Sequence, residues 1–354
     1  MIRTRGLAKR AALAVSLLLL LSCVPFARAQ APNNEKVFSG WIGTYPVRMT
    51  LRRGSGGELT GSYSYDGRAG SLALKGTVDA SGAFTLEEFD GAKPTGTFKG
   101  QWREKAYEPE ARLEGNWTKP GGSGEQGFTL EEELVAGSRV TTKHIKEQNK
   151  ARGYEVDAAY PQVQGAEKFN LLVEQLVMKL VGDFKGNPGV KPPADAPADS
   201  LSIGSSMRLA TDDIQSAVFT ISRYEHGMAH PAYEFRVVNF DAKAGRQLAL
   251  ADLFKPGSDY LQKISAAAVA RLRMINQEYP DGPESFLGDP EYVENASAKA
   301  KNYRNWTLTA RGLAVLFEPY QVGSFASGSP NVLIPYAELK DVLKPGGPLA
   351  SLSK

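Results

Sequence analysis

A glycine flanked by two apolar residues recurs through the first third of the chain, and it limits what this part can fold into. The pattern, apolar-x-Gly-x-apolar, occurs at residues 59–63, 74–78, 98–102 and 113–117. Apolar and polar residues alternate around each copy, which predicts half-buried strands separated by glycine-rich turns. A glycine on the inner face lets a strand bend sharply or lets a neighbouring ring lie across it. We therefore predict that residues 36–134 form a coiled antiparallel meander, closed or nearly closed into a barrel of about eight strands.

The barrel region also contains an internal duplication. The string Phe-Thr-Leu-Glu-Glu occurs at residues 84–88 and again at residues 128–132, each time after two copies of the glycine pattern. A duplicated three-strand unit explains these matches better than chance does. Neighbouring side chains in a strand point to opposite faces, so pairs such as Glu87 and Glu88 cannot share a substrate. We interpret these carboxylates as solvated charge.

Four aromatic residues of the barrel region have two interpretations. Trp41, Tyr63, Trp102 and Trp117 could belong to an ordinary side-chain-filled core, or they could line a pocket for a small molecule or a glycan. The filled core is favoured, because no polar group is expected to converge with these rings.

Helical periodicity first appears after the barrel region. Residues 166–184 carry apolar side chains at i, i+3, i+4 and i+7, which predicts an amphipathic helix, and a second helix is expected to begin near Ser258. Strand-like runs surround both helices without a regular strand–helix–strand alternation. This predicts an α+β fold in which helices cover one face of a mainly antiparallel sheet. We divide the region into a first module at residues 138–254, a second module at 255–343 and a tail at 344–354.

The first 29 residues have the layout of a bacterial signal peptide. A basic start precedes an apolar run that is too short to span a bilayer, and Ala27-Arg28-Ala29 resembles a cleavage site. Cleavage there is the favoured interpretation. The alternative is a lipoprotein signal at residues 20–23, in which Cys23, the only cysteine, carries a lipid that attaches the chain to a membrane. Both interpretations predict an exported protein of the periplasm or cell envelope.

Net charge argues against one class of partner. The chain has 42 basic and 39 acidic residues, but five of the basic residues belong to the export signal. The remaining basic residues nearly balance the acidic ones, so the sequence does not suggest a nucleic-acid partner.

Three strings in the C-terminal region resemble a known family. They are Gly227-Met228-Ala229-His230-Pro231, then Asn239-Phe240-Asp241 with Gly245 and residues 248–254, and finally residues 308–343, which include Tyr320-Gln321-Val322-Gly323. Residues 138–343 resemble the extracytoplasmic region of RsiV-type lysozyme-sensing anti-sigma factors and of PdaC-type peptidoglycan deacetylases. That region is non-catalytic in those proteins, and in the anti-sigma factors it recognises lysozyme. The resemblance implies recognition of a cell-wall glycan or of a lysozyme-like protein. The barrel resembles a β-rich module of other exported bacterial proteins.

The same strings supply the candidate ligand-binding residues, which are Gly227, Ala229, His230, Asp241 and Tyr320. A metal site at His226 and His230 is disfavoured, because the His-x3-His spacing aligns two rings only in a helix and the adjacent Gly227 and Pro231 oppose one. The more ordinary interpretation is a loop in which His230 hydrogen-bonds backbone and positions the following strand.

The sequence contains no nucleophile elbow, Walker motif or dinucleotide-binding fingerprint, and it implies no cofactor. We expect a non-enzymatic binding or sensing protein that recognises a peptidoglycan-related glycan or a lysozyme-like protein through its C-terminal region. Two alternatives stay open. One is an envelope hydrolase of wall polymers whose carboxylates are brought together only by the fold, and the other is a carrier that holds a small apolar ligand in the barrel.

Overall fold

The computed structural model describes residues 35–135, 139–186, 192–193, 196–278 and 285–352. The expected signal peptide and the candidate lipidation residue Cys23 lie outside the described residues. Within those ranges no helix is long and apolar enough to cross a membrane.

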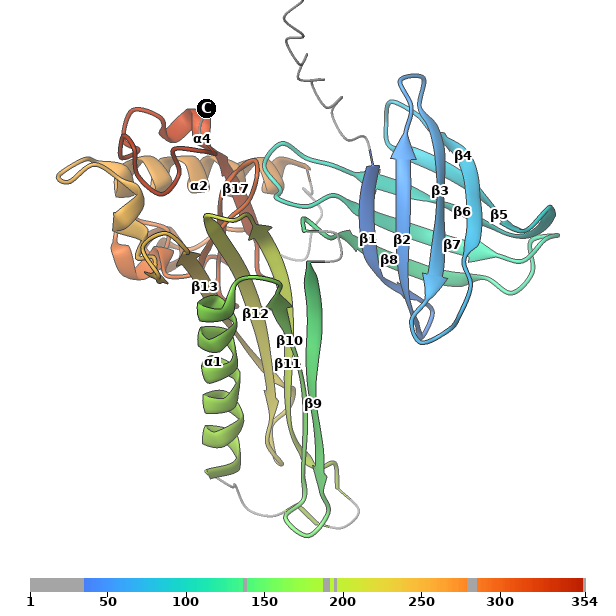
Figure 1. Cartoon of the computed structure of the whole chain (residues 1–354), viewed down its shortest axis with the longest axis horizontal. Helices are drawn as coiled ribbons and strands as arrows, with labels where there is room; N and C mark the ends of the chain where they lie inside the picture. Colours follow the sequence, from blue (N-terminus) through green and yellow to red (C-terminus); the bar gives the residue numbers. More distant parts are fainter. Residues whose placement is uncertain (1–34, 136–138, 187–191, 194–195, 279–284, 353–354) are drawn as a thin grey trace, which may run out of the picture. The chain divides into compact units, whose positions relative to one another are not determined.

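The N-terminal region is a closed barrel of eight strands, as predicted (Figure 1). Each strand pairs antiparallel with the next one along the chain, and β1 closes the barrel by pairing with β8. The strands are β1 (Glu35–Ile42), β2 (Tyr45–Arg53), β3 (Glu58–Tyr65), β4 (Leu72–Val78), β5 (Ala83–Asp90), β6 (Lys93–Arg103), β7 (Arg112–Thr118) and β8 (Gln126–Glu132).

Glycines allow the close approach of neighbouring strands in this barrel. A Cβ atom added to Gly61 or to Gly76 would lie 1.9 Å from a carbonyl oxygen of the adjacent strand. The backbones therefore approach one another more closely at these positions than any side chain allows. A Cβ atom added to Gly96 would lie 2.3 Å from Nε1 of Trp117, because that ring lies across the glycine. The ring expected to lie across an inward-facing glycine thus occurs at Gly96, and the close approach of backbones at Gly61 and Gly76 is a further role of glycine here.

Side chains fill the barrel interior. Phe98 and Phe128 are buried there and meet edge to face, with ring centroids 5.4 Å apart. Tyr63 and Trp102 are buried in the same core, whereas Trp41 points outward and is 56% exposed. Because the aromatic residues divide between core and surface, they do not line one common pocket.

Glu88 contradicts the expectation of solvated charge. It shares the inner face of β5 with buried Leu86 and is 2% exposed, whereas Glu87 is exposed. Its Oε2 atom accepts a 2.6 Å hydrogen bond from the hydroxyl of Tyr63 and a 2.8 Å hydrogen bond from Nε1 of Trp117. The two carboxylates do face opposite ways, as the alternation requires. The inner one stays buried because two aromatic donors satisfy it.

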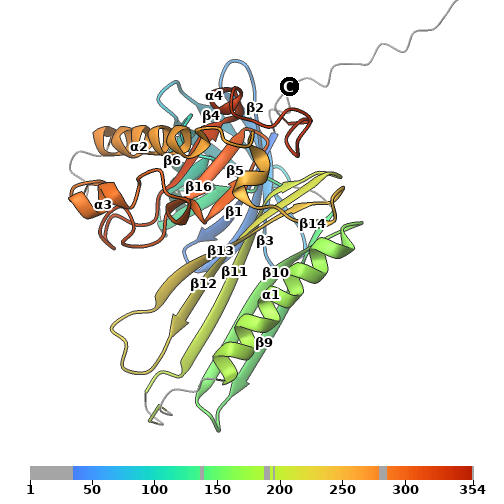
Figure 2. The same cartoon turned by 90° about the vertical axis from the view of Figure 1, so that its left-hand side faces the viewer.

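The next region is a six-stranded sheet in the order β14-β13-β12-β11-β10-β9. Its strands are β9 (Val140–Asn149), β10 (Tyr154–Val163), β11 (Asp199–Ala210), β12 (Ile214–Tyr224), β13 (Ala232–Asp241) and β14 (Arg246–Gln247). Helix α1 (Glu167–Gly186) lies along one face and buries Phe169, Val173 and Val177 (Figure 2). Strands β10 and β11, which α1 connects, are parallel, and all other neighbours in the sheet are antiparallel. The sheet is therefore mainly antiparallel but contains one strand–helix–strand unit that the sequence analysis did not predict.

The last region packs a three-stranded sheet against helices. Its strands are β15 (Trp306–Leu308), β16 (Gly312–Leu316) and β17 (Asn331–Pro335), and its helical elements are η1 (Leu250–Leu253), α2 (Tyr260–Glu278), α3 (Pro290–Glu294), η2 (Ala300–Tyr303) and α4 (Tyr336–Leu339). Two buried hydrogen bonds join this region to the six-stranded sheet. The Asn239 amide donates to the Trp306 carbonyl at 2.8 Å, and the Leu308 N–H donates to the Ser216 hydroxyl at 2.9 Å. The α+β prediction is confirmed.

Candidate functional site

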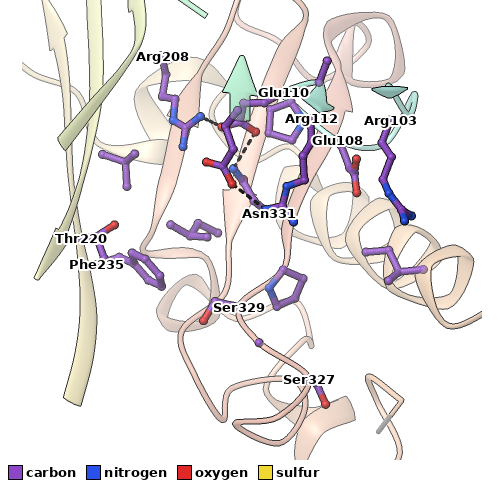
Figure 3. Close-up of a pocket in the computed structure, with 18 of the residues that line it drawn as sticks. Arg103, Glu108, Glu110, Arg112, Arg208, Thr220, Phe235, Ser327, Ser329 and Asn331 are labelled. Carbon is purple, nitrogen blue, oxygen red and sulfur yellow. Dashed lines mark hydrogen bonds and ion pairs between the residues drawn. The ribbon is translucent and has the colours of Figure 1, made fainter. Parts of the chain in front are cut away.

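A cleft opens on the face of the six-stranded sheet that α1 does not cover. Val218, Thr220 and Phe235 line it from β12 and β13, and the connection between β16 and β17 forms a second wall (Figure 3). A third wall is the barrel's β6–β7 loop, which contributes residues 108–111. The cavity has a volume of about 660 Å³, and a smaller hollow of about 160 Å³ adjoins it and shares several of its lining residues.

Tyr233, Phe235 and Phe325 line the smaller hollow, and the rings of His230 and Tyr320 contact Phe325. We call these five residues the aromatic face: His230, Tyr233, Phe235, Tyr320 and Phe325. The His230 ring stacks on Phe325, with centroids 4.7 Å apart and planes 27° apart, and the Tyr320 ring lies 5.5 Å from Phe325. Tyr320 is 55% exposed, Tyr233 42% and Phe325 39%, so much of this apolar area contacts water. Large exposed rings that cluster beside a cavity are a common feature of ligand-binding surfaces.

Tyr320 adopts a left-handed backbone conformation, with φ of 65°. Such a conformation is unusual for a residue with a side chain, and the surrounding structure must stabilise it. Gln321 provides this support: its side-chain amide donates to the carbonyls of Asn295 and Asn302 at 3.2 and 2.9 Å, and its carbonyl oxygen accepts from the Glu318 N–H at 3.1 Å. The turn therefore holds the Tyr320 ring at the surface at a cost in backbone energy.

The opposite part of the cleft is charged. Arg208 of β11 forms an ion pair with Glu110 of the β6–β7 loop, and the side chains of both residues are largely buried. The Asn331 amide donates to the same carboxylate at 3.5 Å. Burial lowers the pKa of the Arg208 guanidinium to about 10, which still leaves Arg208 positively charged at neutral pH.

Glu108, a second carboxylate in this wall, is in a different electrostatic state. Burial raises the pKa of Glu108, Arg112 opposes that shift, and the negative charge of Glu278 adds to it. The cleft thus combines a carboxylate paired with an arginine and a carboxylate whose neutral form is favoured by desolvation. Among the residues that the structure describes, no three His, Cys, Asp or Glu side chains gather as a metal site would require.

The structure brings together only some of the residues that the sequence indicated. His230 and Tyr320, which are far apart in the chain, meet on either side of Phe325. Gly227 lies in the same β12–β13 loop with φ of 97°, and Ala229 is exposed beside His230. The ring nitrogen Nδ1 of His230 lies 3.0 Å from the carbonyl oxygen of Pro231, in agreement with the loop interpretation.

Asp241 lies apart from these residues. It ends β13, whereas His230 precedes the start of that strand, and a strand of this length spans roughly 30 Å. Its Oδ1 atom accepts a 2.8 Å hydrogen bond from the Ala244 N–H, so the carboxylate stabilises the turn into β14. Asp241 therefore does not contribute to the aromatic face.

Three residues of the aromatic face were not among the sequence candidates, and neither were the charged residues of the cleft. Phe325 links the rings of His230 and Tyr320, yet it lies in a loop where no periodicity marks it. Tyr233 and Phe235 alternate along β13, which is a signal for an exposed sheet face that the sequence analysis did not use.

A family model matches part of the C-terminal region. Residues 251–337 match a family described as "Protein of unknown function (DUF3298)". The chain is 26% identical over 131 residues to the peptidoglycan-N-acetylmuramic acid deacetylase PdaC of Bacillus subtilis (strain 168). That match covers 37% of this chain and 27% of the relative, so the chain spans about a quarter of the curated relative's length.

Two crystal structures of DUF3298 family proteins are also similar to this chain. The protein from Pseudomonas aeruginosa PAO1 is 14% identical with a TM-score of 0.43, and the match covers 60% of this chain and 97% of that one. The protein from Bacteroides fragilis is 16% identical with a TM-score of 0.44, and the match covers 61% of this chain and 96% of that one.

Proposed function

We propose that this chain is a non-catalytic binding protein of the bacterial cell envelope, and that its aromatic face binds a peptidoglycan-related glycan. The observation that carries the proposal is the contiguous group of rings formed by His230, Phe325 and Tyr320 beside a hollow lined by Tyr233 and Phe235. The chain's similarity to a protein named as a peptidoglycan deacetylase supports a ligand from the wall. The export signal expected in residues 1–29 supports the compartment.

The chemistry of sugars suits this surface. A pyranose ring presents C–H groups on its faces, and these carry a small positive charge that the negative face of an aromatic ring attracts. Burying such a face also removes apolar area from water on both partners. Exposed rings that neighbouring residues already hold in position lose little conformational entropy when a sugar stacks on them. The aromatic face therefore offers a prepared platform for consecutive sugar rings.

The charged part of the cleft fits the substituents of a wall glycan. Peptidoglycan carries carboxylate, amide and hydroxyl groups beside its sugar rings, and a polymer that stacks on Tyr233 and Phe235 would direct some of these groups toward Asn331 and Arg208. Both residues line the larger cavity that adjoins the aromatic face. Arginine and amide side chains are suitable partners for such groups.

Co-sedimentation with purified insoluble peptidoglycan tests the proposal. The double variant Tyr320→Ala/Phe325→Ala removes two rings of the aromatic face, and we expect it to weaken binding at least tenfold. Leu171→Ala/Met178→Ala is the matched control, because those two apolar side chains are just as exposed, at 56% and 52%, but lie on α1. Equal binding by both double variants would show that the aromatic face is not the site.

Two further assays distinguish the alternatives. The resemblance to lysozyme-sensing proteins motivates a pull-down with lysozyme, and retention of lysozyme without retention of peptidoglycan would replace the glycan with a protein ligand. Release of soluble wall fragments during incubation would indicate a hydrolase. Glu108→Gln and Glu110→Gln would then identify the carboxylate on which turnover depends.

A further inference from the structure

One end of the barrel holds a cluster of aromatic rings around a buried carboxylate, and nothing in the proposed function uses it. We call this cluster the barrel mouth: Tyr45, Tyr63, Tyr65, Glu88 and Trp117. The Tyr65 ring meets the rings of Tyr45 and Tyr63 edge to face, with centroids 6.0 Å and 5.4 Å apart. Tyr63 and Trp117 both donate hydrogen bonds to Glu88 Oε2. Four rings and one carboxylate thus form a continuous group contributed by β2, β3, β5 and β7.

The carboxylate of Glu88 lacks a positive partner. It is 2% exposed, and both of its donors, the Tyr63 hydroxyl and the Trp117 indole, are neutral. No salt bridge from the described part of the chain reaches it. A buried carboxylate is costly without a compensating charge, even when neutral donors satisfy it. Burial and the hydrogen bond to Glu88 also raise the pKa of Tyr63, so its hydroxyl remains a donor throughout the ordinary pH range.

A cation from the chain itself already lies on the rings of the barrel mouth. The guanidinium of Arg68 lies 5.6 Å from the Tyr45 ring centroid and 5.5 Å from the Tyr65 ring centroid. Arg68 is exposed and belongs to the tight β3–β4 turn, where its N–H donates to the Tyr65 carbonyl at 3.1 Å. Its side chain can therefore leave the rings without disturbing a strand.

We propose that the barrel mouth is a binding site for an organic cation, in particular a ligand with a quaternary ammonium group. In the absence of such a ligand the Arg68 guanidinium lies on the rings of Tyr45 and Tyr65, and the ligand displaces it. Aromatic rings attract cations through their quadrupole, and cages of several rings are well suited to quaternary ammonium groups. Glu88 supplies the negative charge that completes the site. Tyr63 and Trp117 bind the carboxylate, whereas Tyr45 and Tyr65 already hold a cation, and this combination distinguishes the mouth from an ordinary aromatic core.

The opposite end of the barrel provides an internal control. There the guanidinium of Arg53 lies 5.9 Å from the ring centroid of Trp102. Trp102 donates to Glu104, which also pairs with Lys36, so that carboxylate already has a positive partner. Arg53→Ala removes a comparable cation–aromatic contact from the barrel without touching the proposed site.

Isothermal titration calorimetry with choline chloride tests the proposal on the full chain. The neutral isostere 3,3-dimethylbutan-1-ol serves as the ligand control, and sodium chloride balances the ionic strength. We expect saturable binding of choline and at least tenfold weaker binding of the alcohol. Because Arg68→Ala removes the competing cation, we expect it to tighten choline binding about threefold to tenfold. Arg53→Ala should leave the affinity unchanged.

Two variants test the contributions of the carboxylate and of a ring separately. Glu88→Gln removes the negative charge and Tyr65→Leu removes one partly exposed ring, and each should weaken choline binding at least tenfold. If Glu88→Gln fails to fold, Tyr65→Leu alone decides this part of the test. Vesicles of phosphatidylcholine, compared at equal headgroup concentration, distinguish a lipid headgroup from a soluble ligand, and binding of either supports the site.

Three results would overturn the proposal. The first is no saturable choline binding by the Arg68→Ala protein, and the second is equal affinity for the alcohol. The third is weaker binding after Arg68→Ala, which would make the arginine a permanent part of the structure and not a competitor. Loss of choline binding would leave the glycan site untouched, because the aromatic face belongs to the C-terminal region.

Discussion

Tyr320 is expected to strengthen glycan binding through its ring and to lower stability through its strained backbone, and two substitutions separate these effects. Tyr320→Ala and Tyr320→Gly both remove the ring from the aromatic face. They differ in the backbone, because φ is 65° at this position and only glycine adopts that conformation without strain. The two variants should therefore bind glycan equally poorly but differ in stability.

The size of the stability difference follows from backbone energies. The left-handed conformation costs a residue with a Cβ atom about 1–2 kcal/mol, and glycine avoids that cost. Glycine also has more freedom in the unfolded chain, which offsets about 0.5–1 kcal/mol of the gain. Tyr320→Gly should thus be more stable than Tyr320→Ala by about 0.5–1 kcal/mol. For a region of this size, that corresponds to a melting temperature about 1–4 °C higher.

The loss of binding can be estimated from the area that a sugar would cover. Removing roughly 60 Å² of stacked surface at about 25 cal/mol per Å² costs about 1.5 kcal/mol, which is about a tenfold change in Kd. Trp306 is the only tryptophan of the C-terminal region and is buried, so its fluorescence can follow melting there after Trp41, Trp102 and Trp117 are replaced by phenylalanine. Equal melting of the two variants would refute the strain argument, and wild-type binding by either would refute the role of the ring.

Three further predictions concern the barrel and the charged part of the cleft. Gly76→Ala should destabilise the barrel by about 3 kcal/mol or more, measured by chemical denaturation, because its Cβ would lie 1.9 Å from a backbone carbonyl oxygen. Arg208→Met should destabilise the protein by about 3 kcal/mol, because it leaves the buried charge of Glu110 without its partner. Adding Glu110→Leu should recover much of that loss, because an apolar pair costs less than an unpaired buried charge. A double variant no more stable than the single one would contradict this. Burial raises the pKa of Glu108, so ionisation of its carboxyl group in the folded state is unfavourable. The protonated carboxyl group contributes fully to stability below its unfolded pKa of about 4, and this contribution is lost as pH rises through the raised pKa of the folded state. Glu108→Gln should therefore stabilise the protein at pH 7 and have no effect near pH 3, as melting at the two pH values will show.

Local sequence patterns predicted the barrel well. Apolar and polar residues alternate within each strand, and the inward-facing glycines stand where a neighbouring backbone or ring leaves no room for a side chain. The six-stranded sheet was harder. Strand β9 has no apolar alternation, since polar side chains such as Glu147 face α1, where Glu147 pairs with Lys185 at 2.7 Å. Strand β11 begins at Asp199, directly after a sequence rich in proline that is typical of a loop and gives no sign of a strand.

The candidate site was only partly predictable, for a different reason. His230 and Tyr320 were indicated separately, by strings that resemble a family, but nothing local relates residues so far apart in the chain. Their meeting depends on how the β12–β13 loop and the loop after β16 fold over one face of the sheet. The ion pair of Arg208 with Glu110 likewise joins the barrel to the C-terminal region. The sequence pattern around neither residue predicts this pair.

A crystal structure of residues 35–354 with a wall disaccharide, N-acetylglucosamine linked to N-acetylmuramic acid, would show whether the aromatic face binds wall glycan. We expect electron density for a sugar ring stacked on Phe325 or Tyr320, with its substituents directed into the adjoining hollow. Density for the disaccharide elsewhere on the molecule, with the aromatic face empty, would contradict it.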